Sequence, residues 1–244
     1  MVPLRLLASL AAPLALAAAL PAQACSVAEG YRAPGNFALV AEADAIVLGR
    51  VAGGSAALGL EGSITVQPLA AIKGLMPGQE FPLAGMSLAP ELAASDPLEL
   101  GAPHPDALAG ACIRTRFAPG ATVLFFLDRV DGQWVPAGDA FSRWAEDVSD
   151  VDAPWIQLTR FYARLAQLPA DQRTALLEAE RDALRARADE PAAQAIAYDL
   201  DRALAAPPPA TAEAAPADDG WRQPGDVTAV QRALDAMRAD GEER

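Results

Sequence analysis

The sequence contains few of the residues on which catalytic and metal sites usually depend. It has two cysteines, Cys25 and Cys112, and a single histidine, His104. Zinc is held by Cys, His and acidic side chains, so a zinc site here would need both cysteines together with carboxylates. Prolines on either side of His104 predict that it lies in an exposed loop. We therefore expect no enzymatic activity, no cofactor and no metal bound by the chain itself.

Positive charge is also scarce. The chain carries 19 Lys and Arg residues against 32 Asp and Glu residues, which gives a formal net charge of −13. Binding to nucleic acid depends on clustered Lys and Arg side chains that displace counterions from the phosphates. The composition therefore argues against nucleic acid as a partner, and equally against anionic membrane surfaces.

Long hydrophobic runs are missing except at the N-terminus. Arg5 precedes an apolar stretch over residues 6–20, and Ala22-Gln23-Ala24 has the form of a signal-peptidase cleavage site. The stretch is too short and too rich in alanine to span a membrane, and no other segment reaches about 18 apolar residues. The sequence thus predicts a signal peptide over residues 1–24, no transmembrane segment, and a periplasmic or secreted mature protein.

Cleavage after Ala24 would make Cys25 the first residue of the mature chain. In an oxidising compartment two cysteines are expected to pair, so we predict a disulfide between Cys25 and Cys112. The alternative is a lipid anchor at Cys25, as in bacterial lipoproteins. Residues 22–24 fit the lipoprotein signal poorly, and lipidation would leave Cys112 without its partner.

Residues 25–150 have the pattern of a small antiparallel β-structure. Asp131-Gly132 is a strong hairpin signal, and Pro68 indicates an edge position or a bulge. A segment rich in proline, alanine and acidic residues, 86–110, predicts a long loop. No helical pattern separates the strands, which favours an antiparallel barrel or sandwich. The predicted strands are 45–51, 64–69, 80–83, 121–127 and 133–136, and we expect Val47, Val66, Leu124 and Phe126 to lie largely inside the barrel.

The pattern changes after residue 150. Apolar residues recur at helical spacing over 151–206, which predicts three short helices, the last of them beginning at Pro191. Residues 207–225 are rich in proline, alanine and acid and predict a disordered linker. A short amphipathic helix is predicted over 226–240.

Several short motifs in residues 25–150 resemble the N-terminal domain of the tissue inhibitors of metalloproteinases, which belongs to the netrin-like OB-fold group. Their order and spacing carry the resemblance. The resemblance implies an α+β protein in which an antiparallel OB-fold-like barrel precedes a small all-helical C-terminal region. The motifs are Cys25-Ser26, Ala43 to Val47, Ile72-Lys73-Gly74, Cys112, Gly120 to Leu127, Asp131-Gly132 and Trp144.

The same resemblance implies a function. In that family the α-amine and carbonyl of the N-terminal cysteine chelate the catalytic zinc of a metalloprotease, and the next side chain enters its specificity pocket. Carried over, Cys25 would chelate the target zinc and Ser26 would fill the pocket. Val27, Ala111 and Ile113 would complete the inhibitory edge.

The sequence departs from the family pattern at three positions. Val27, Ala41 and Gly138 stand where the family has cysteines, so two of its three disulfides in this domain are missing. The alternative function is therefore a non-inhibitory structural or protein-interaction module of the cell envelope.

Three further patterns have both a functional and a structural interpretation, and we expect the structural one for each. The acidic residues could bind a cation, the aromatic residues could line a ligand groove, and the serine stands in a motif vaguely similar to a nucleophile elbow. The structural interpretations are a solvated junction, a packed core and an ordinary loop. The acidic residues are Glu146, Asp147, Asp150 and Asp152. The aromatic residues are Phe125, Phe126 and Trp134, and the serine is Ser87.

Overall fold

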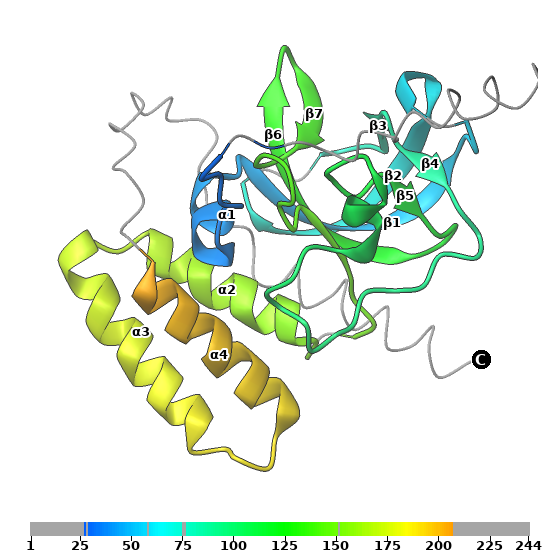
Figure 1. Ribbon diagram of the computed structural model, residues 1–244. Helices are drawn as coiled ribbons and strands as arrows, with labels where there is room; N and C mark the ends of the chain where they lie inside the picture. Colours follow the sequence, from blue (N-terminus) through cyan, green and yellow to red (C-terminus); the bar gives the residue numbers. More distant parts are fainter. Residues whose placement is uncertain (1–26, 28, 58, 75–76, 151, 207–244) are drawn as a thin grey trace, which may run out of the picture.

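The computed structural model describes residues 27, 29–57, 59–74, 77–150 and 152–206. Strands fill the first part of the chain and three long helices fill the last part (Figure 1). The helices are α1 (Asn36–Glu42), α2 (Pro154–Ala166), α3 (Ala170–Arg185) and α4 (Pro191–Ala205), with short 3₁₀ turns η2 (Gly59–Glu61) and η3 (Pro105–Ala109). The strands are β1 (Ala45–Gly54), β2 (Ser63–Lys73), β3 (Phe81–Ala84), β4 (Ser87–Leu88), β5 (Arg116–Phe117), β6 (Thr122–Val130), β7 (Gln133–Pro136) and β8 (Ala145–Asp147).

The main sheet is antiparallel and nearly closes into a barrel. Its strands follow the order β3-β2-β1-β6-β7, and β8 pairs with β6. The two edge strands approach each other through Phe81 on β3 and Trp134 on β7, whose ring centroids lie 6.3 Å apart. The short strands β4 and β5 form a separate parallel pair. The predicted α+β class, with a barrel followed by a helical region, is confirmed at this level.

The two faces of the sheet belong to different hydrophobic cores. The barrel interior contains Val47, Val66 and Phe125, while Leu124 and Phe126 lie on the opposite face, which the helices cover. Alternate residues of a strand point to opposite faces, so β6 contributes to both cores. All five side chains are fully buried.

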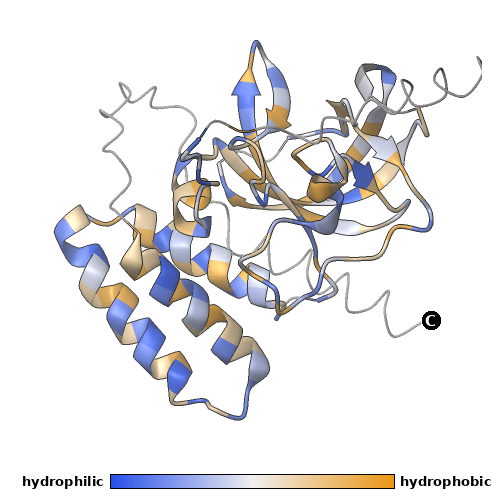
Figure 2. Ribbon diagram, viewed as in Figure 1, coloured by the Kyte–Doolittle hydropathy of each residue, from blue (hydrophilic) through white to orange (hydrophobic). Residues whose placement is uncertain are grey.

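The helical region packs on the sheet through α2. Trp155 is buried and its ring lies 6.1 Å from that of Phe126, in a T-shaped arrangement. Figure 1 shows α2 next to the barrel and α3 on the far side of the helical layer, and Figure 2 shows hydrophilic and apolar residues mixed along α3. Helix α4 begins at Pro191, as predicted, because the fixed φ and missing N–H of proline suit the first turn of a helix.

A buried polar contact joins the first and last helices. Asp199 on α4 accepts hydrogen bonds from the Tyr162 hydroxyl (2.8 Å) and from Nδ2 of Asn36 at the start of α1 (2.9 Å). Burial raises the pKa of Asp199, although the Tyr162 hydroxyl, the Arg202 guanidinium and Asn36 act in the opposite direction. Burial likewise raises the pKa of Tyr162, and the neighbouring Asp199 raises it further.

Local sequence signals explain the turns and irregularities of the sheet. Asp131 and Gly132 both have positive φ (50° and 79°), which the tight two-residue connection of β6 and β7 requires. The register between β1 and β2 shifts at Gly49, which pairs with Pro68, so the predicted bulge is present. This part of β2 also lies beyond its pairing with β3.

The Lys73-Gly74 motif fixes the junction between α1 and β1. Nζ of Lys73, the only lysine of the chain, donates to the carbonyl oxygens of Val40 (2.9 Å), Ala41 (2.7 Å) and Ala43 (2.7 Å). A cation is favoured at a helix C-terminus, where carbonyl groups lack partners. Gly74 has φ of +71°, and a Cβ there would lie 2.3 Å from the Asp44 carbonyl oxygen.

The long segment 86–110 is held at several points along its length. It contains β4 and η3. The backbone N–H of Ser95 donates to Asp147 on β8 (2.9 Å), and Leu100 is buried in the core on the helical side. The predicted loop is thus a fixed strap over the barrel.

Some predicted features lie outside the described residues. These are the signal peptide over 1–24, the linker over 207–225 and the short helix over 226–240. Among the described residues, none of the helices has the length and apolarity needed to cross a membrane.

Candidate functional site

The predicted inhibitory edge is only partly within the described residues. Cys25 and Ser26 lie outside them. Val27 and Ala111 are exposed, and Ile113 is half-buried against the barrel core. The described part of the edge therefore consists of Val27 and of the loop that carries Cys112.

Hydrogen bonds place Tyr31, one of the first described residues, close to the Cys112 loop. The Tyr31 hydroxyl donates to the carbonyl oxygen of Ala140 (2.5 Å). The next residue, Phe141, donates its backbone N–H to the carbonyl oxygen of Cys112 (2.5 Å). The residues near the predicted mature N-terminus thus lie beside the Cys112 loop, although the sequence separates them by about eighty positions.

Cys112 itself has an unusual backbone conformation. Its φ is +65°, a region that residues with a side chain enter at a cost of about 1 kcal/mol or more. Cys112 does not carry a free thiol. Because Cys25 is not among the described residues, its pairing with Cys112 stays a prediction.

Asp106 holds both ends of the Cys112 loop together. Its Oδ2 accepts hydrogen bonds from the backbone N–H groups of Thr115 (2.7 Å) and Arg116 (2.9 Å), and its Oδ1 accepts from Nε of Arg116. Burial alone would raise the pKa of Asp106, but the two N–H groups and the Arg116 guanidinium outweigh it, so the pKa lies below its usual value. The carboxylate therefore stays charged under neutral conditions and acts as a clamp across residues 106–116.

A second buried ion pair fixes the same loop to the barrel. Nη2 of Arg114 donates to both carboxylate oxygens of Asp147 (2.9 and 3.0 Å), and Nη1 donates to the Ala145 carbonyl (3.2 Å). The Arg114 guanidinium also lies 4.5 Å above the Phe117 ring. Hydrogen bonds between two charged groups are shorter and stronger than those between neutral groups. The indole N–H of Trp144 donates to the Arg114 carbonyl (3.1 Å), so backbone and side chain are both held.

The prediction that His104 is an exposed loop residue is wrong. Its side chain is buried, and its Nδ1 accepts the backbone N–H of Asp106 (3.0 Å), which caps η3. Burial and the nearby Arg114 lower the pKa of His104 to about 4, so the ring is neutral near pH 7. His104 is thus part of the support of the Cys112 loop.

The predicted solvated acidic junction is only half correct. Asp150 and Asp152 are exposed, but Glu146 is fully buried, and its Oε1 accepts from Nε of Arg143 (2.7 Å). Asp147 is the partner of Arg114 described above. The described residues contain no group of three or more His, Cys, Asp or Glu side chains placed to hold a metal ion.

The other two weighed patterns are structural. Phe125 and Phe126 are fully buried core residues, and Trp134 packs half-buried against Phe81. Ser87 is buried in β4, and its backbone N–H bonds to Thr115 (2.9 Å), so it does not stand at a strand-to-helix turn.

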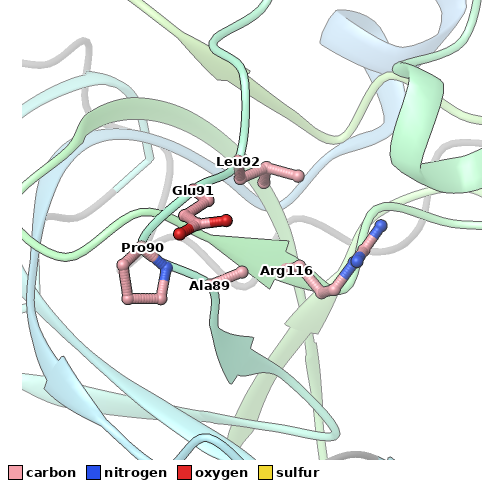
Figure 3. A pocket seen from close by; sticks show the side chains of 5 residues that line it. All are labelled: Ala89, Pro90, Glu91, Leu92 and Arg116. Carbon is pink, nitrogen blue, oxygen red and sulfur yellow. The ribbon is translucent and has the colours of Figure 1, made fainter.

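A small pocket lies beside Arg116, the ion-pair partner of Asp106. It has a volume of about 360 Å³ and is lined by residues 89–92 and Arg116 (Figure 3). Figure 3 shows the Arg116 side chain extending away from Pro90 and Glu91. Nε of Arg116 donates to Asp106, so Arg116 both lines the pocket and helps to hold the Cys112 loop.

Sequence reasoning missed the residues that support the site. Asp106, Arg114 and Asp147 have no distinctive spacing, and Arg114 and Asp147 are far apart in the sequence. The only local signal was Pro105 followed by Asp106, which is typical of the start of a short helical turn. No family model, no curated protein and no solved structure matches this chain.

Proposed function

We propose that the protein is an exported OB-fold-like inhibitor whose N-terminal edge binds the catalytic zinc of a metalloprotease. In this proposal Cys25 is the first mature residue and is joined to Cys112. The single observation that carries the proposal is the position of Tyr31, which hydrogen bonds place beside the Cys112 loop. Cys25 precedes Tyr31 by six positions, and six extended residues span at most about 20 Å, so the proposal keeps Cys25 within that distance of Tyr31.

The strand pairing supports the OB-fold part of the proposal. An OB fold is a five-stranded, partly open antiparallel barrel. Here β1 pairs with both β2 and β6, while β3 and β7 form the two approaching edges. The order and partial closure of these five strands support the OB-fold part of the proposal.

The chemistry follows from the coordination of zinc. A catalytic zinc keeps an open position for water, which a bidentate ligand can displace. The α-amine and carbonyl of Cys25 form such a ligand if the amine is deprotonated. An α-amine has an ordinary pKa of about 8, so binding should weaken as the pH falls below that value. The Cys112 loop would present the ligand in one fixed orientation, because Asp106 and Arg114 fix that loop to the barrel.

The test compares the mature protein with a form that carries one extra alanine before Cys25. The extension removes the chelating amine from its position and leaves the barrel and the disulfide unchanged. Both forms are assayed against a panel of zinc endopeptidases, and mass spectrometry verifies the N-terminus and the bridge. We expect inhibition by the mature form and loss of at least tenfold in the extended form. Equal activity of the two forms, or no inhibition by either, would contradict the proposal.

A second candidate is a non-inhibitory interaction module of the cell envelope. It is favoured by two exposed apolar side chains of the helical region, Tyr198 on α4, which is 68% exposed, and Leu176 on α3, which is 44% exposed. Single exposed apolar residues are common on surfaces, so this observation carries less weight than the position of Tyr31. This candidate would be favoured if binding to a protein of the cell envelope survived the alanine extension but was lost on Tyr198→Ser.

A further inference from the structure

We propose that a water molecule is bound in a buried polar site between α2 and β8. The site is formed by Glu146 on β8 and by Trp155 and Thr159 on α2, each of which is at most 1% exposed. Oε2 of Glu146, Nε1 of Trp155 and Oγ1 of Thr159 have no hydrogen-bond partner among the described residues. Buried polar atoms in folded proteins nearly always have one, so these three atoms point to a bound molecule. This inference does not depend on the proposed function.

The sheet directs Glu146 toward the face that α2 covers. Glu146 stands opposite Leu124 of β6, and residues directly opposite each other on neighbouring strands share a face of the sheet. Leu124 belongs to the core on the helical side, as does Phe126 two residues later. The Trp155 ring lies 6.1 Å from that of Phe126. Glu146 therefore faces the part of α2 that carries Trp155.

Arg143 contacts both sides of the site. Its Nε donates to Oε1 of Glu146 (2.7 Å), and its Cζ lies 4.8 Å from the centre of the Trp155 ring. Its Nη1 donates to the carbonyl oxygen of Glu99, which belongs to the strap over the barrel. Thr159 follows Trp155 by four residues on α2, so the two side chains are neighbours on the same face of the helix. The three unpartnered atoms are thus gathered in one polar region next to Arg143.

The hydrogen-bonding roles of the three atoms select water as the ligand. Nε1 of Trp155 can only donate, Oε2 of the Glu146 carboxylate can only accept, and Oγ1 of Thr159 can do both. A water molecule accepts from the indole N–H, donates to the carboxylate and forms a third bond with the hydroxyl group, and about three bonds are usual for a buried water. An anion would be repelled by Glu146, and a cation would lie against the guanidinium of Arg143.

The first test compares two buried indole groups of the full-length protein by NMR. Nε1 of Trp144 is the control, because it donates to the carbonyl oxygen of Arg114 (3.1 Å). We expect magnetisation transfer from a long-lived water to the indole N–H of Trp155 and none to that of Trp144. A crystal structure should show ordered solvent within about 3.2 Å of Nε1 of Trp155 and Oε2 of Glu146. The proposal is overturned if Trp155 receives no transfer, or if these two side chains bind each other directly.

The second test is Thr159→Val, for which the presence and the absence of the water predict opposite signs. Valine has nearly the shape and the helix propensity of threonine but lacks the hydroxyl group. If the hydroxyl group binds the water, its loss should lower the equilibrium constant for folding, measured in urea, about fivefold. Without a water the variant removes an unpaired buried hydroxyl group, so an unchanged or higher constant overturns the proposal. Thr174→Val, at an exposed position of α3, is the control and should change the constant by less than about twofold.

Discussion

Replacement of Asp106 by asparagine tests how the Cys112 loop is held. The carboxylate is almost completely buried and accepts four hydrogen bonds, two from backbone N–H groups, one from Nε of Arg116 and a longer one from the Thr115 hydroxyl (3.4 Å). Asparagine has the same shape but no charge, and its NH₂ group cannot accept. A buried hydrogen bond to a charged group contributes about 1.5 to 3 kcal/mol, and the variant loses at least one such bond and weakens the others. We therefore expect Asp106→Asn to lower the free energy of unfolding by about 2 to 4 kcal/mol.

The pH dependence gives an independent check on the same residue. The folded protein holds the pKa of Asp106 below its usual value, so its contribution to stability is fully present above the pKa of the unfolded chain. The contribution is lost as the pH falls through the lower pKa of the folded state. The destabilising effect of Asp106→Asn should therefore be constant from pH 7 to about pH 5 and shrink at pH values below about 4.

The assay is urea unfolding under non-reducing conditions, followed by tryptophan fluorescence. Asp189→Asn, in the exposed turn between α3 and α4, is the control and should change the free energy of unfolding by less than about 0.5 kcal/mol. Amide hydrogen exchange at Thr115 and Arg116 should accelerate in Asp106→Asn only. The clamp would be refuted if the two variants had equal unfolding midpoints, or if exchange at these two amides did not change.

Three further predictions concern the sheet and its contacts, each measured by the midpoint of urea unfolding. Gly74→Ala should destabilise by more than about 1 kcal/mol, because its φ is +71° and the new Cβ would meet the Asp44 carbonyl; Gly53→Ala, where a Cβ has open space, is its control and should cost less. Trp155→Ala should cost about 3 to 5 kcal/mol through the cavity left between α2 and β6, and a loss below 1 kcal/mol would contradict this packing. Lys73→Met keeps the aliphatic stem but removes three hydrogen bonds, and should cost about 2 kcal/mol; no effect would show that these bonds do not stabilise the α1–β1 junction.

Local pattern predicted β1, β2, β3, β6 and β7 and the helices α2 to α4, because each has a clear periodicity or a clear end, but it missed the short strands β4, β5 and β8. Asp131-Gly132 predicted a tight turn and Pro191 predicted the start of a helix, and both are present. The prediction that Leu124 and Phe126 on β6 point into the barrel interior is wrong. Residues 123–127 are all apolar, so the strand has no polar face to show which core each residue joins, and Leu124 and Phe126 belong to the helical side and not to the barrel interior.

The support of the candidate site was hidden for a different reason. His104 looks exposed from its neighbours, but the strap that carries it folds over the barrel and buries it. Arg114 and Asp147 form their ion pair across 33 positions, and no local pattern couples charges at that distance. Tertiary contacts of this kind decide whether a charged residue is solvated or buried, and a single sequence does not reveal them.

The boundary near residue 150 separates two sequence patterns, but one hydrophobic core contains residues from both sides of it. Ile46, Leu48, Leu124 and Phe126 of the sheet share one hydrophobic cluster with α2 and α4. Burial of such a side chain stabilises by about 1.5 to 3 kcal/mol, so uncovering these four residues would cost about 6 to 12 kcal/mol. A typical domain has a total stability of about 5 to 15 kcal/mol. The sheet therefore needs the helices to stay folded. The Cys112 loop and the neighbouring Tyr31 are held on this sheet, so their position also depends on the helices.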